Sequence, residues 1–393
     1  MWCVLVVAIQ ACGYPQLPRL DVNLDATETG SGTGFDAAEG QPGGDAINMP
    51  APFAPLHLDP AMLLAGAPDL TLSADPSLID TAALTVNGTT NAFFVQQGNY
   101  AVLFTRAFSV QHDVKITGTL PLIVVARDAV VVSASIDLGA TGTTPGPGAT
   151  AVGIGVSGSG TTSVIVDTRV SGGGGGGGFG SLGASGGDGG AQGGAGGLRY
   201  GLQITDPLIG GSAGGLGGNQ PQRGGAGGGA LQISSAVSIT VTGSYITAGG
   251  GGGSGGGGTA NGGCGGGSGG EIILEAPMIM ISSTLAANGG GGGGGGTGGG
   301  PIGGGTSGSD WFAGDQPAFG GLGGDPQGSD GGKGAAGQSG SFVEAQPGSG
   351  FNSKGGGGGG GAGRIWLRYR ASTPPIANGA VFSPPAGLDP TLP

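Results

Sequence analysis

Apolar and polar residues alternate in short runs along the chain, and the clearest runs lie between residues 230 and 290. One copy of the pattern has three alternating pairs: Leu231 with Ile233, Ile239 with Val241, and Ile246 with Ala248. A second copy follows about forty residues later, with the matching pairs Ile272 and Leu274, Ile279 and Ile281, and Leu285 and Ala287. Alternation with a period of two is typical of a strand with one buried face. The pattern therefore predicts a repeated unit of three short strands.

A repeated three-strand unit predicts an all-β fold of the parallel β-helix type, a solenoid with three strands per coil. One unit cannot bury its apolar face alone, whereas stacked units enclose a continuous core. A glycine tract follows each copy of the unit, so we expect long glycine-rich insertions that leave the stack at one corner.

The same pattern extends the expected stack in both directions. Two earlier coils are predicted from Val102 and Phe104, Phe108 and Val110, Val114 and Ile116, and then from Ile123 and Val125, Ala129 and Val131, Ile136 and Leu138. Val164 to Val166 is predicted as one strand of a third coil, and Arg364 to Arg370 as the last strand.

Five segments are expected along the chain. They are a signal peptide at 1–11, a disordered tether at 12–50, an N-terminal cap at 51–100, the glycine-rich β-helix at 101–380 and a C-terminal tail at 381–393. The run Ile9-Gln10-Ala11-Cys12 resembles the lipobox of bacterial lipoproteins, which implies that Cys12 is acylated. An ordinary secretion signal is the alternative interpretation. The tether lacks apolar periodicity and cannot offset the entropy of ordering its backbone.

Glycine dominates the composition, with 103 of 393 residues. Long helices are disfavoured, because glycine in a helix interior costs roughly 1 kcal/mol relative to alanine. Collagen is excluded because the glycines form continuous runs instead of occupying every third position. Two structures remain open for these tracts: disordered brushes, or polyproline-II-like segments that hydrogen-bond laterally, where only glycine allows close approach.

Charge and chemistry point away from nucleic acid and from metals. The formal net charge is −12, and nucleic acid attracts clusters of basic residues. The glycine loops contain Asp188, Asp310, Asp315, Asp325 and Asp330, which could bind calcium, but the nonapeptide calcium repeat is missing. No cofactor, metal or catalytic residue is predicted. Cys264 is interpreted as a small residue in a loop, with an intermolecular disulfide as the alternative, and His112 as a solvated corner residue that could pair with Asp113.

Several stretches resemble a group of uncharacterised glycine-rich surface lipoproteins of gliding soil bacteria. They are 121–142, GGGALQI at 227–233, GGEIILEAP at 269–277, LAANGGGGGGG at 285–295 and GAGRIWL at 361–367. The glycine tracts are more loosely similar to those of PE-PGRS proteins, although no PE domain precedes them. The resemblance implies a secreted or surface location and no particular activity.

These observations favour a non-enzymatic, surface-anchored protein with a structural or adhesive role. Its expected location is the outer membrane or cell surface, or the medium if it is secreted. Its expected partners are the membrane, through a lipid on Cys12, and matrix, glycan or neighbouring cells. The alternative is a β-helix polysaccharide lyase or hydrolase, since such enzymes cluster charged residues on one exposed face. Against this alternative, Asp137 and Glu275 are expected on different coils without visible partners.

Overall fold

The computed structural model describes residues 53–393, with gaps at 150–161, 166–167, 202, 219–221, 258–260, 297–303, 312, 325–327, 339–340 and 351–353. Every described residue belongs to one compact unit, Asp45–Pro393. The predicted signal peptide, Cys12 and the tether at 12–50 therefore lie outside the described residues.

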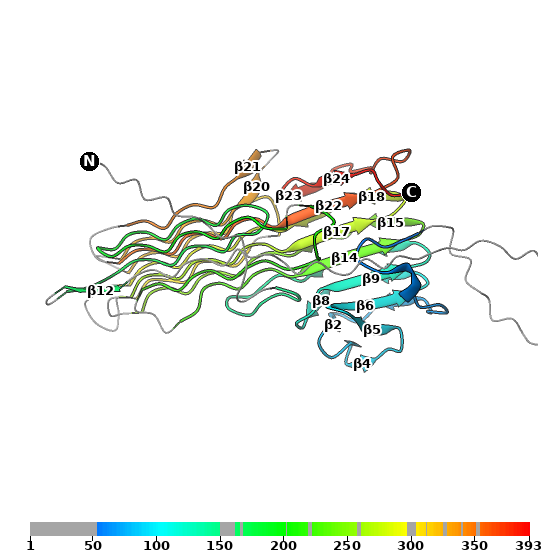
Figure 1. The fold of residues 1–393 in the computed structure, drawn as a ribbon, viewed down its shortest axis with the longest axis horizontal. Coiled ribbons are helices and arrows are strands. Elements are labelled where there is room, and N and C mark those ends of the chain that lie inside the picture. The colour runs from blue at the N-terminus through cyan, green and yellow to red at the C-terminus, as the bar shows by residue number, and fades with distance from the viewer. Residues whose placement is uncertain are drawn as a thin grey trace, which may run out of the picture. The chain divides into compact units, whose positions relative to one another are not determined.

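The described chain is all-β, as the sequence predicts. Its one helix is the short 3-10 helix η1 (Pro60–Met62). Three sheets hold most of the strands, and neighbouring strands within each sheet are mainly parallel (Figure 1). The seven-stranded sheet has the order β24 (Gly387–Asp389), β22 (Arg364–Arg368), β17 (Glu271–Glu275), β14 (Ala230–Ser235), β9 (Leu122–Ala126), β6 (Tyr100–Thr105) and β5 (Phe94–Gln97).

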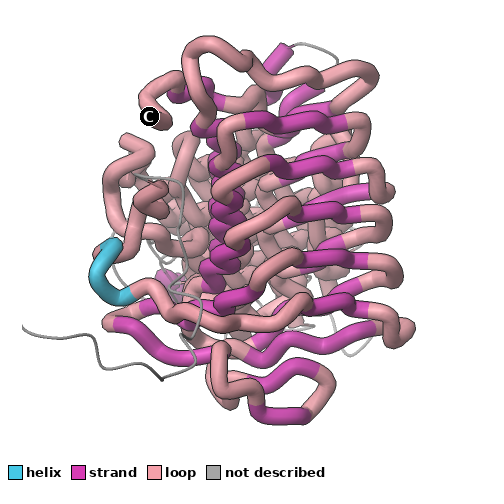
Figure 2. Tube along the Cα trace, turned by 90° about the vertical axis from the view of Figure 1, so that its right-hand side faces the viewer, coloured by secondary structure: helices cyan, strands magenta, loops and turns pink. Residues whose placement is uncertain are grey.

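The other two large sheets are built from the strands that follow in the chain. The five-stranded sheet has the order β1 (Leu70–Leu72), β7 (Phe108–Val110), β10 (Val130–Val132), β15 (Ser238–Val241) and β18 (Met278–Ile281). The eight-stranded sheet has the order β23 (Val381–Ser383), β19 (Thr284–Ala286), β16 (Tyr245–Thr247), β11 (Ile136–Asp137), β8 (Val114–Thr117), β2 (Ser77–Asp80), β3 (Thr85–Val86) and β4 (Thr89–Thr90). Four times the chain passes through the seven-, five- and eight-stranded sheets in this order, and Figure 2 shows the resulting columns of stacked strands.

The two sequence copies lie in register, as the alternation predicts. Leu231 pairs with Ile272, Ile239 with Ile279, and Ile246 with Leu285. All six side chains are at most 1% exposed and belong to one apolar cluster that draws on all three sheets. Burial of this cluster is the main force that holds the strands together.

Three strands of the first two predicted coils, β6, β9 and β10, differ from the sequence prediction in which residues face the core. The other three predicted pairs lie in the core as expected: Phe108 and Val110, Val114 and Ile116, and Ile136 and Leu138. In the seven-stranded sheet the core residues are Leu103, Leu122 and Val124, whereas Val102, Phe104, Ile123 and Val125 form a second cluster on the opposite face. In β10 the core residues are Val130 and Val132, and Val131 is exposed. Alternation could not choose the face here, because every residue of β6 and β9 except the half-buried Tyr100 is buried and apolar or Thr.

The predicted strand at Val164 to Val166 does not join the stack. Strands β12 (Thr162–Ile165) and β13 (Thr168–Ser171) form a separate antiparallel hairpin, and β9, β10 and β11 pair instead with β14, β15 and β16. A second small hairpin joins β20 (Ala336–Gln338) and β21 (Ser341–Val343). At the end of the chain, β23 and β24 pair with β19 and β22, so 381–393 contributes strands to two sheets.

The glycine tracts are ordered and bonded laterally to one another. We call the described parts of 171–229, 249–270 and 287–363 the glycine array, which Figure 1 shows as wavy lines beside the strands. Segment 261–270 shows its geometry. Its backbone amides donate in a repeat of three. The amides of Gly262, Gly265 and Ser268 donate to carbonyl groups in 212–218. The amides one residue later donate to carbonyl groups in 355–361, and those two residues later donate to carbonyl groups in 248–254. The repeat of three is that of a polyproline II helix, which has no internal hydrogen bonds.

The carbonyl groups of segment 261–270 complete its surroundings. They accept hydrogen bonds from residues in 174–177, 225–228 and 290–296, so six neighbouring stretches surround this segment. A side chain does not fit at most of the interior glycines: a Cβ on Gly357 would lie 1.9 Å from the carbonyl oxygen of Cys264. The small side chains of Cys264 and Ser268 are exceptions and are fully buried. The glycine content of these tracts is therefore a packing requirement.

Side chains on the outer segments follow the same repeat of three. Exposed residues recur at every third position in 182–188 (Leu182, Ser185, Asp188), 192–198 (Gln192, Ala195, Leu198) and 316–322 (Gln316, Phe319, Leu322). Each outer segment therefore presents one row of side chains to solvent while its other two faces bond to neighbours.

Candidate binding pocket

The outer face of the seven-stranded sheet is covered by other parts of the chain. Its apolar cluster includes Val102, Ile123 and Ile273, and residues of 53–67 and 204–208 pack against it. This sheet is consequently buried on both faces, and the two groups of polar side chains on its outer face are held in a low-dielectric setting.

The first polar group centres on Glu275, whose side chain is fully buried. Its Oε2 atom accepts hydrogen bonds from the Leu56 amide (3.0 Å), the Ser234 hydroxyl (2.8 Å) and the Gln232 amide group (3.2 Å). Its Oε1 atom accepts from Arg368, which also lies 3.5 Å from Asp389. His57 extends the group, because its ring bonds to Gln232 and to the carbonyl of Asp206.

These hydrogen bonds attach Leu56 and His57 to strands β17 and β14 of the seven-stranded sheet. Four donors, one of them the Arg368 guanidinium, hold the Glu275 carboxylate in place. Asp137, the other carboxylate considered for catalysis, lies on β11 in the eight-stranded sheet and pairs with Lys115 at 2.7 Å. The two carboxylates thus belong to different sheets, and each has a basic partner that the sequence did not reveal.

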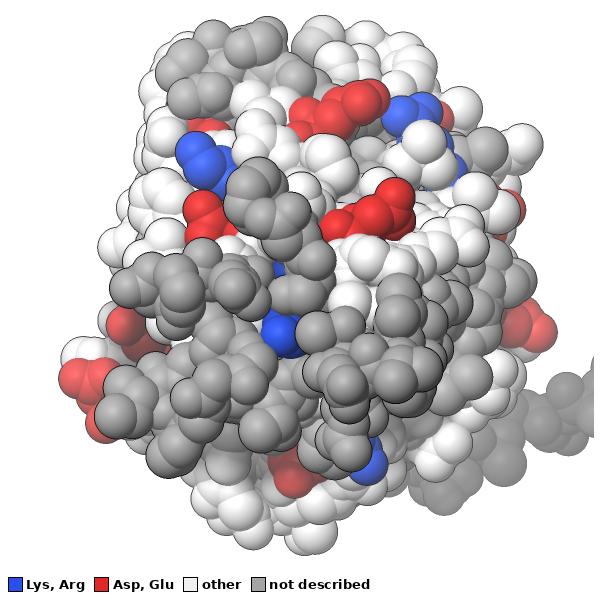
Figure 3. Space-filling view, turned by 90° about the vertical axis from the view of Figure 1, so that its left-hand side faces the viewer, with Lys and Arg blue, Asp and Glu red and all other residues white. Residues whose placement is uncertain are grey.

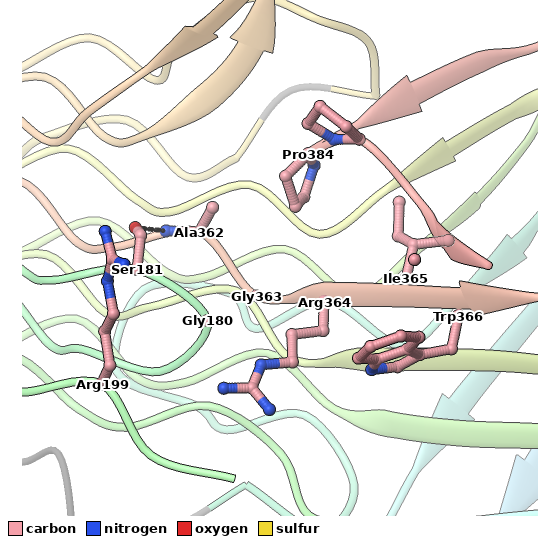
Figure 4. Close-up of a pocket in the computed structure, with 11 residues that line it drawn as sticks. Gly180, Ser181, Arg199, Ala362, Gly363, Arg364, Ile365, Trp366 and Pro384 are labelled. Atoms are coloured by element: carbon pink, nitrogen blue, oxygen red, sulfur yellow. Dashed lines mark hydrogen bonds between the residues drawn. The ribbon is translucent and has the colours of Figure 1, made fainter. Parts of the chain in front are cut away.

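The second polar group lies where β22 leaves the glycine array, and it borders a pocket of about 320 Å³. The pocket is lined by residues from three parts of the chain: Gly180, Ser181 and Arg199; Ala362 to Trp366; and Pro384, Pro385 and Gly387. Figure 4 shows Arg364 and Trp366 extending from β22, with Ser181 and Arg199 on one side and Pro384 on another. The Ser181 hydroxyl accepts a hydrogen bond of 2.8 Å from the backbone amide of Ala362. This bond joins two of the chain segments that line the pocket.

Arg364 is an unusual residue in this wall because it is charged and only 8% exposed. Its guanidinium stacks over Phe179 at 5.0 Å from the ring centre, and Nη2 donates to the carbonyl of Tyr200. Its Nη1 atom is buried without a hydrogen-bond partner, and so is the Nε1 atom of Trp366 two residues later. A buried donor without an acceptor costs about 1–3 kcal/mol.

Glu271 lies beside Arg364 in the sheet register, yet no hydrogen bond joins their side chains among the contacts of the described residues. Burial raises the pKa of Glu271 to about 8, the positive charge of Arg364 opposes this rise, and Asp206 adds to it. Near neutral pH the Glu271 side chain is therefore an uncharged carboxylic acid. The positive charge of Arg364 has no carboxylate that neutralises it fully.

Arg199, the second cation of the pocket, is half exposed and loosely held. Its nearest acidic group is Glu344, 3.9 Å away and itself 76% exposed. The sequence indicated the basic and aromatic character of the last strand, but it could not predict this pocket. Ser181 and Arg199 are separated from Arg364 by more than 160 residues of glycine-rich chain.

The remaining residues considered from the sequence have structural surroundings. Cys264 is fully buried in segment 261–270, and its sulfur accepts a hydrogen bond of 3.5 Å from the Gly217 amide. It is therefore packed inside the glycine array, whereas we expected a small residue in a loop. His112 lies 3.9 Å from Asp75, and no contact joins it to Asp113 among the described pairs.

The aspartates of the glycine loops accept hydrogen bonds from backbone amides. The Asp310 carboxylate accepts hydrogen bonds from the amides of Gly142 and Gly252, at 2.8 and 2.7 Å. Asp188 accepts one from the Gly193 amide, and Asp330 accepts one from the Gly323 amide. Asp315 bonds to Gln316, and Asp325 lies outside the described residues. No group of three or more potential metal ligands occurs among the residues that the structure describes.

A second cavity, of about 660 Å³, lies beyond the last strands and is mainly apolar, with Leu367, Tyr369, Phe382 and Leu388 in its walls. Within 53–393, outside the gaps, no helix has the length and apolarity needed to cross a bilayer. Comparisons with protein-family models, with curated proteins and with solved structures find no match to this chain.

Proposed function

We propose that the described chain is a parallel β-helix with three strands per coil and that the protein is a non-enzymatic structural or adhesive component of a cell surface. The fold proposal is supported by the order in which the chain visits the three sheets and by the single apolar cluster between them. The glycine array is an extension of this helix at the corner between the eight- and seven-stranded sheets, since its segments follow β16 and β19 and lead into β17 and β22.

The observation that carries the proposed role is the six-neighbour packing of the glycine segments. Segment 261–270 is bonded to its neighbours mainly through backbone groups, with added bonds to the buried side chains of Cys264 and Ser268, so the array is a stiff body with few side chains in its interior. Its outer segments carry rows of side chains, including Leu198 and Phe319, which are 69% and 59% exposed. Figure 3, which faces the ends of these segments, shows separate acidic and basic groups among uncharged residues.

A stiff body with mostly uncharged rows of side chains suits contact with other surfaces. Attachment through a lipid on Cys12, with 12–50 as the tether, would place this body outside the membrane. Replacing Cys12 with alanine should move the protein from the membrane fraction to the soluble fraction. Unchanged partitioning of the C12A variant would refute the anchor.

Deletion of the gene tests the role itself. We expect weaker attachment of cells to surfaces or to one another, restored by the wild-type gene. Normal attachment after deletion would refute adhesion. The enzymatic alternative predicts that the purified protein depolymerises glycans and that one carboxylate substitution, such as Asp137→Asn, abolishes turnover. That result would replace the proposed function.

A further inference from the structure

The pocket beside β22 has the features of a built binding site. Two guanidinium groups from distant parts of the chain, Arg199 and Arg364, line the same cavity. One of them is buried and retains an unsatisfied N–H, and the adjacent Trp366 retains another. A buried donor without an acceptor is uncommon in a folded protein, and a bound ligand or an ordered water can supply the missing acceptor.

The charge of the pocket selects an anion. Guanidinium groups match carboxylates in geometry and charge, and a site with little water strengthens the attraction. No acidic residue is among those that line the cavity. The loose contact between Arg199 and Glu344 leaves the Arg199 guanidinium able to reorient toward a ligand.

The rest of the wall selects a ring. Trp366, Pro384 and Pro385 supply flat apolar surfaces, and the lining also includes the polar residue Ser181. At about 320 Å³ the cavity is at the small end of ligand pockets, which run from about 300 Å³ upward. A sugar ring that carries a carboxylate combines an apolar ring face, hydroxyl groups and a negative charge.

We infer that this pocket binds a carboxylate-bearing sugar of an acidic glycan. Arg199 and Arg364 attract the carboxylate, while Trp366 and the two prolines contact the ring. The inference rests on the proposed adhesive function, because it names the class of molecule that the surface protein recognises. The negative net charge of the chain keeps acidic polymers away from other surfaces, so recognition depends on this local positive potential.

The test is calorimetric titration of the purified full chain with a galacturonic acid oligosaccharide, using the matching neutral galactose oligosaccharide as the control ligand. We expect saturable binding of the acidic oligosaccharide and binding of the neutral one that is weaker by about tenfold or more, the loss for one charged hydrogen-bond pair. Equal binding of the two sugars would overturn the inference. Binding of sodium acetate or inorganic sulfate as tight as that of the acidic sugar would also overturn it, as it would indicate a simple anion site.

Variants locate the binding. Arg199→Gln should weaken binding of the acidic oligosaccharide by about tenfold or more while the fold is kept, because Arg199 is half exposed. Arg223→Gln is the matched control, since Arg223 is exposed and does not line the pocket. Trp366→Phe, which keeps an aromatic ring but removes the unsatisfied N–H, should also weaken binding. Unchanged affinity in the R199Q variant would refute the assignment of the site.

The outcome is separable from that of the proposed function. If gene deletion leaves attachment normal while the acidic oligosaccharide still binds through Arg199, the adhesive role fails and the pocket stands. If deletion abolishes attachment, the oligosaccharide does not bind and the R199Q variant still restores attachment, the pocket assignment fails and the adhesive role stands.

Discussion

Replacing one interior glycine with alanine should destabilise the glycine array by a predictable amount. Gly357 lies in the stretch 354–363, and a Cβ there would be 1.9 Å from the Cys264 carbonyl oxygen. An ordinary contact is 3.4 Å or more, so the two segments must separate by about 1.5 Å. The three bonds between them, from Gly263, Gly266 and Gly269, are 2.9–3.0 Å long and would exceed hydrogen-bonding distance after this shift.

The expected cost follows from those three bonds. Each contributes about 1 kcal/mol net, and a buried donor left without an acceptor costs about 1–3 kcal/mol. The lower entropy of alanine in the unfolded chain offsets at most about 1 kcal/mol. We therefore expect Gly357→Ala to lower the free energy of unfolding by about 2–3 kcal/mol or more.

Denaturant titration followed by circular dichroism measures this loss, and amide hydrogen exchange shows where it occurs. Gly314→Ala is the control, because a Cβ at Gly314 meets nothing within 4 Å and its backbone is not left-handed. That variant should be as stable as the wild type or slightly more stable. If the Gly357→Ala and Gly314→Ala variants unfold at the same denaturant concentration, the glycine segments are not packed as closely as the structure indicates.

Three further predictions follow from the same structure. Amides of 262–270 should exchange with solvent far more slowly than a random coil, as measured by mass spectrometry, since all of them are bonded; random-coil rates would restore the disordered alternative. Cys264 should resist a thiol reagent until the protein is unfolded, because burial excludes the reagent and raises the pKa of the thiol; fast labelling of its peptide would contradict this. For Glu271, the folded protein keeps a proton that the unfolded chain releases above pH 4.5, so stability should fall as the pH rises from about 4.5 to about 8, by up to about 5 kcal/mol. Glu271→Gln should remove this part of the pH dependence, and an identical pH profile in the variant would show that Glu271 is ionised in the folded state.

The buried faces of β14 to β19 were predictable from the sequence, and those of β6, β9 and β10 were not. Leu231 and Ile239 have polar or small neighbours, so period-two alternation identifies their buried face. Val102 and Leu103 are both apolar because both faces of β6 are covered, and no pattern distinguishes the two faces. Residues from 53–67 cover the outer face of the seven-stranded sheet, and their sequence has no sustained alternation of apolar and polar residues that would predict this.

The glycine tracts illustrate a second limit of sequence analysis. Glycine has no side chain that could mark its surroundings, so an interior position such as Gly266 and a position with open space beside it such as Gly314 look alike in the sequence. The informative residues were the exceptions: Leu182, Ser185 and Asp188 recur every third position, and this spacing marks the solvent-facing row of an outer segment. Neither pattern could place Arg199 and Arg364 in one pocket, since this arrangement depends on how the segments between them pack.

The strand stack and the glycine array depend on each other because each provides what the other lacks. A glycine residue loses more backbone entropy on ordering than any other residue type. A glycine segment also buries no apolar side chain that would offset this loss. The ladder between β16 and β19 continues without interruption into the array, with bonds from Ala248 to Ala286, Gly250 to Asn288, and Gly253 to Gly291. The apolar core therefore fixes the ends and the spacing of the segments before they meet. An array held in this way should order only when the strands have stacked, and the pocket at their junction should form only when both are in place.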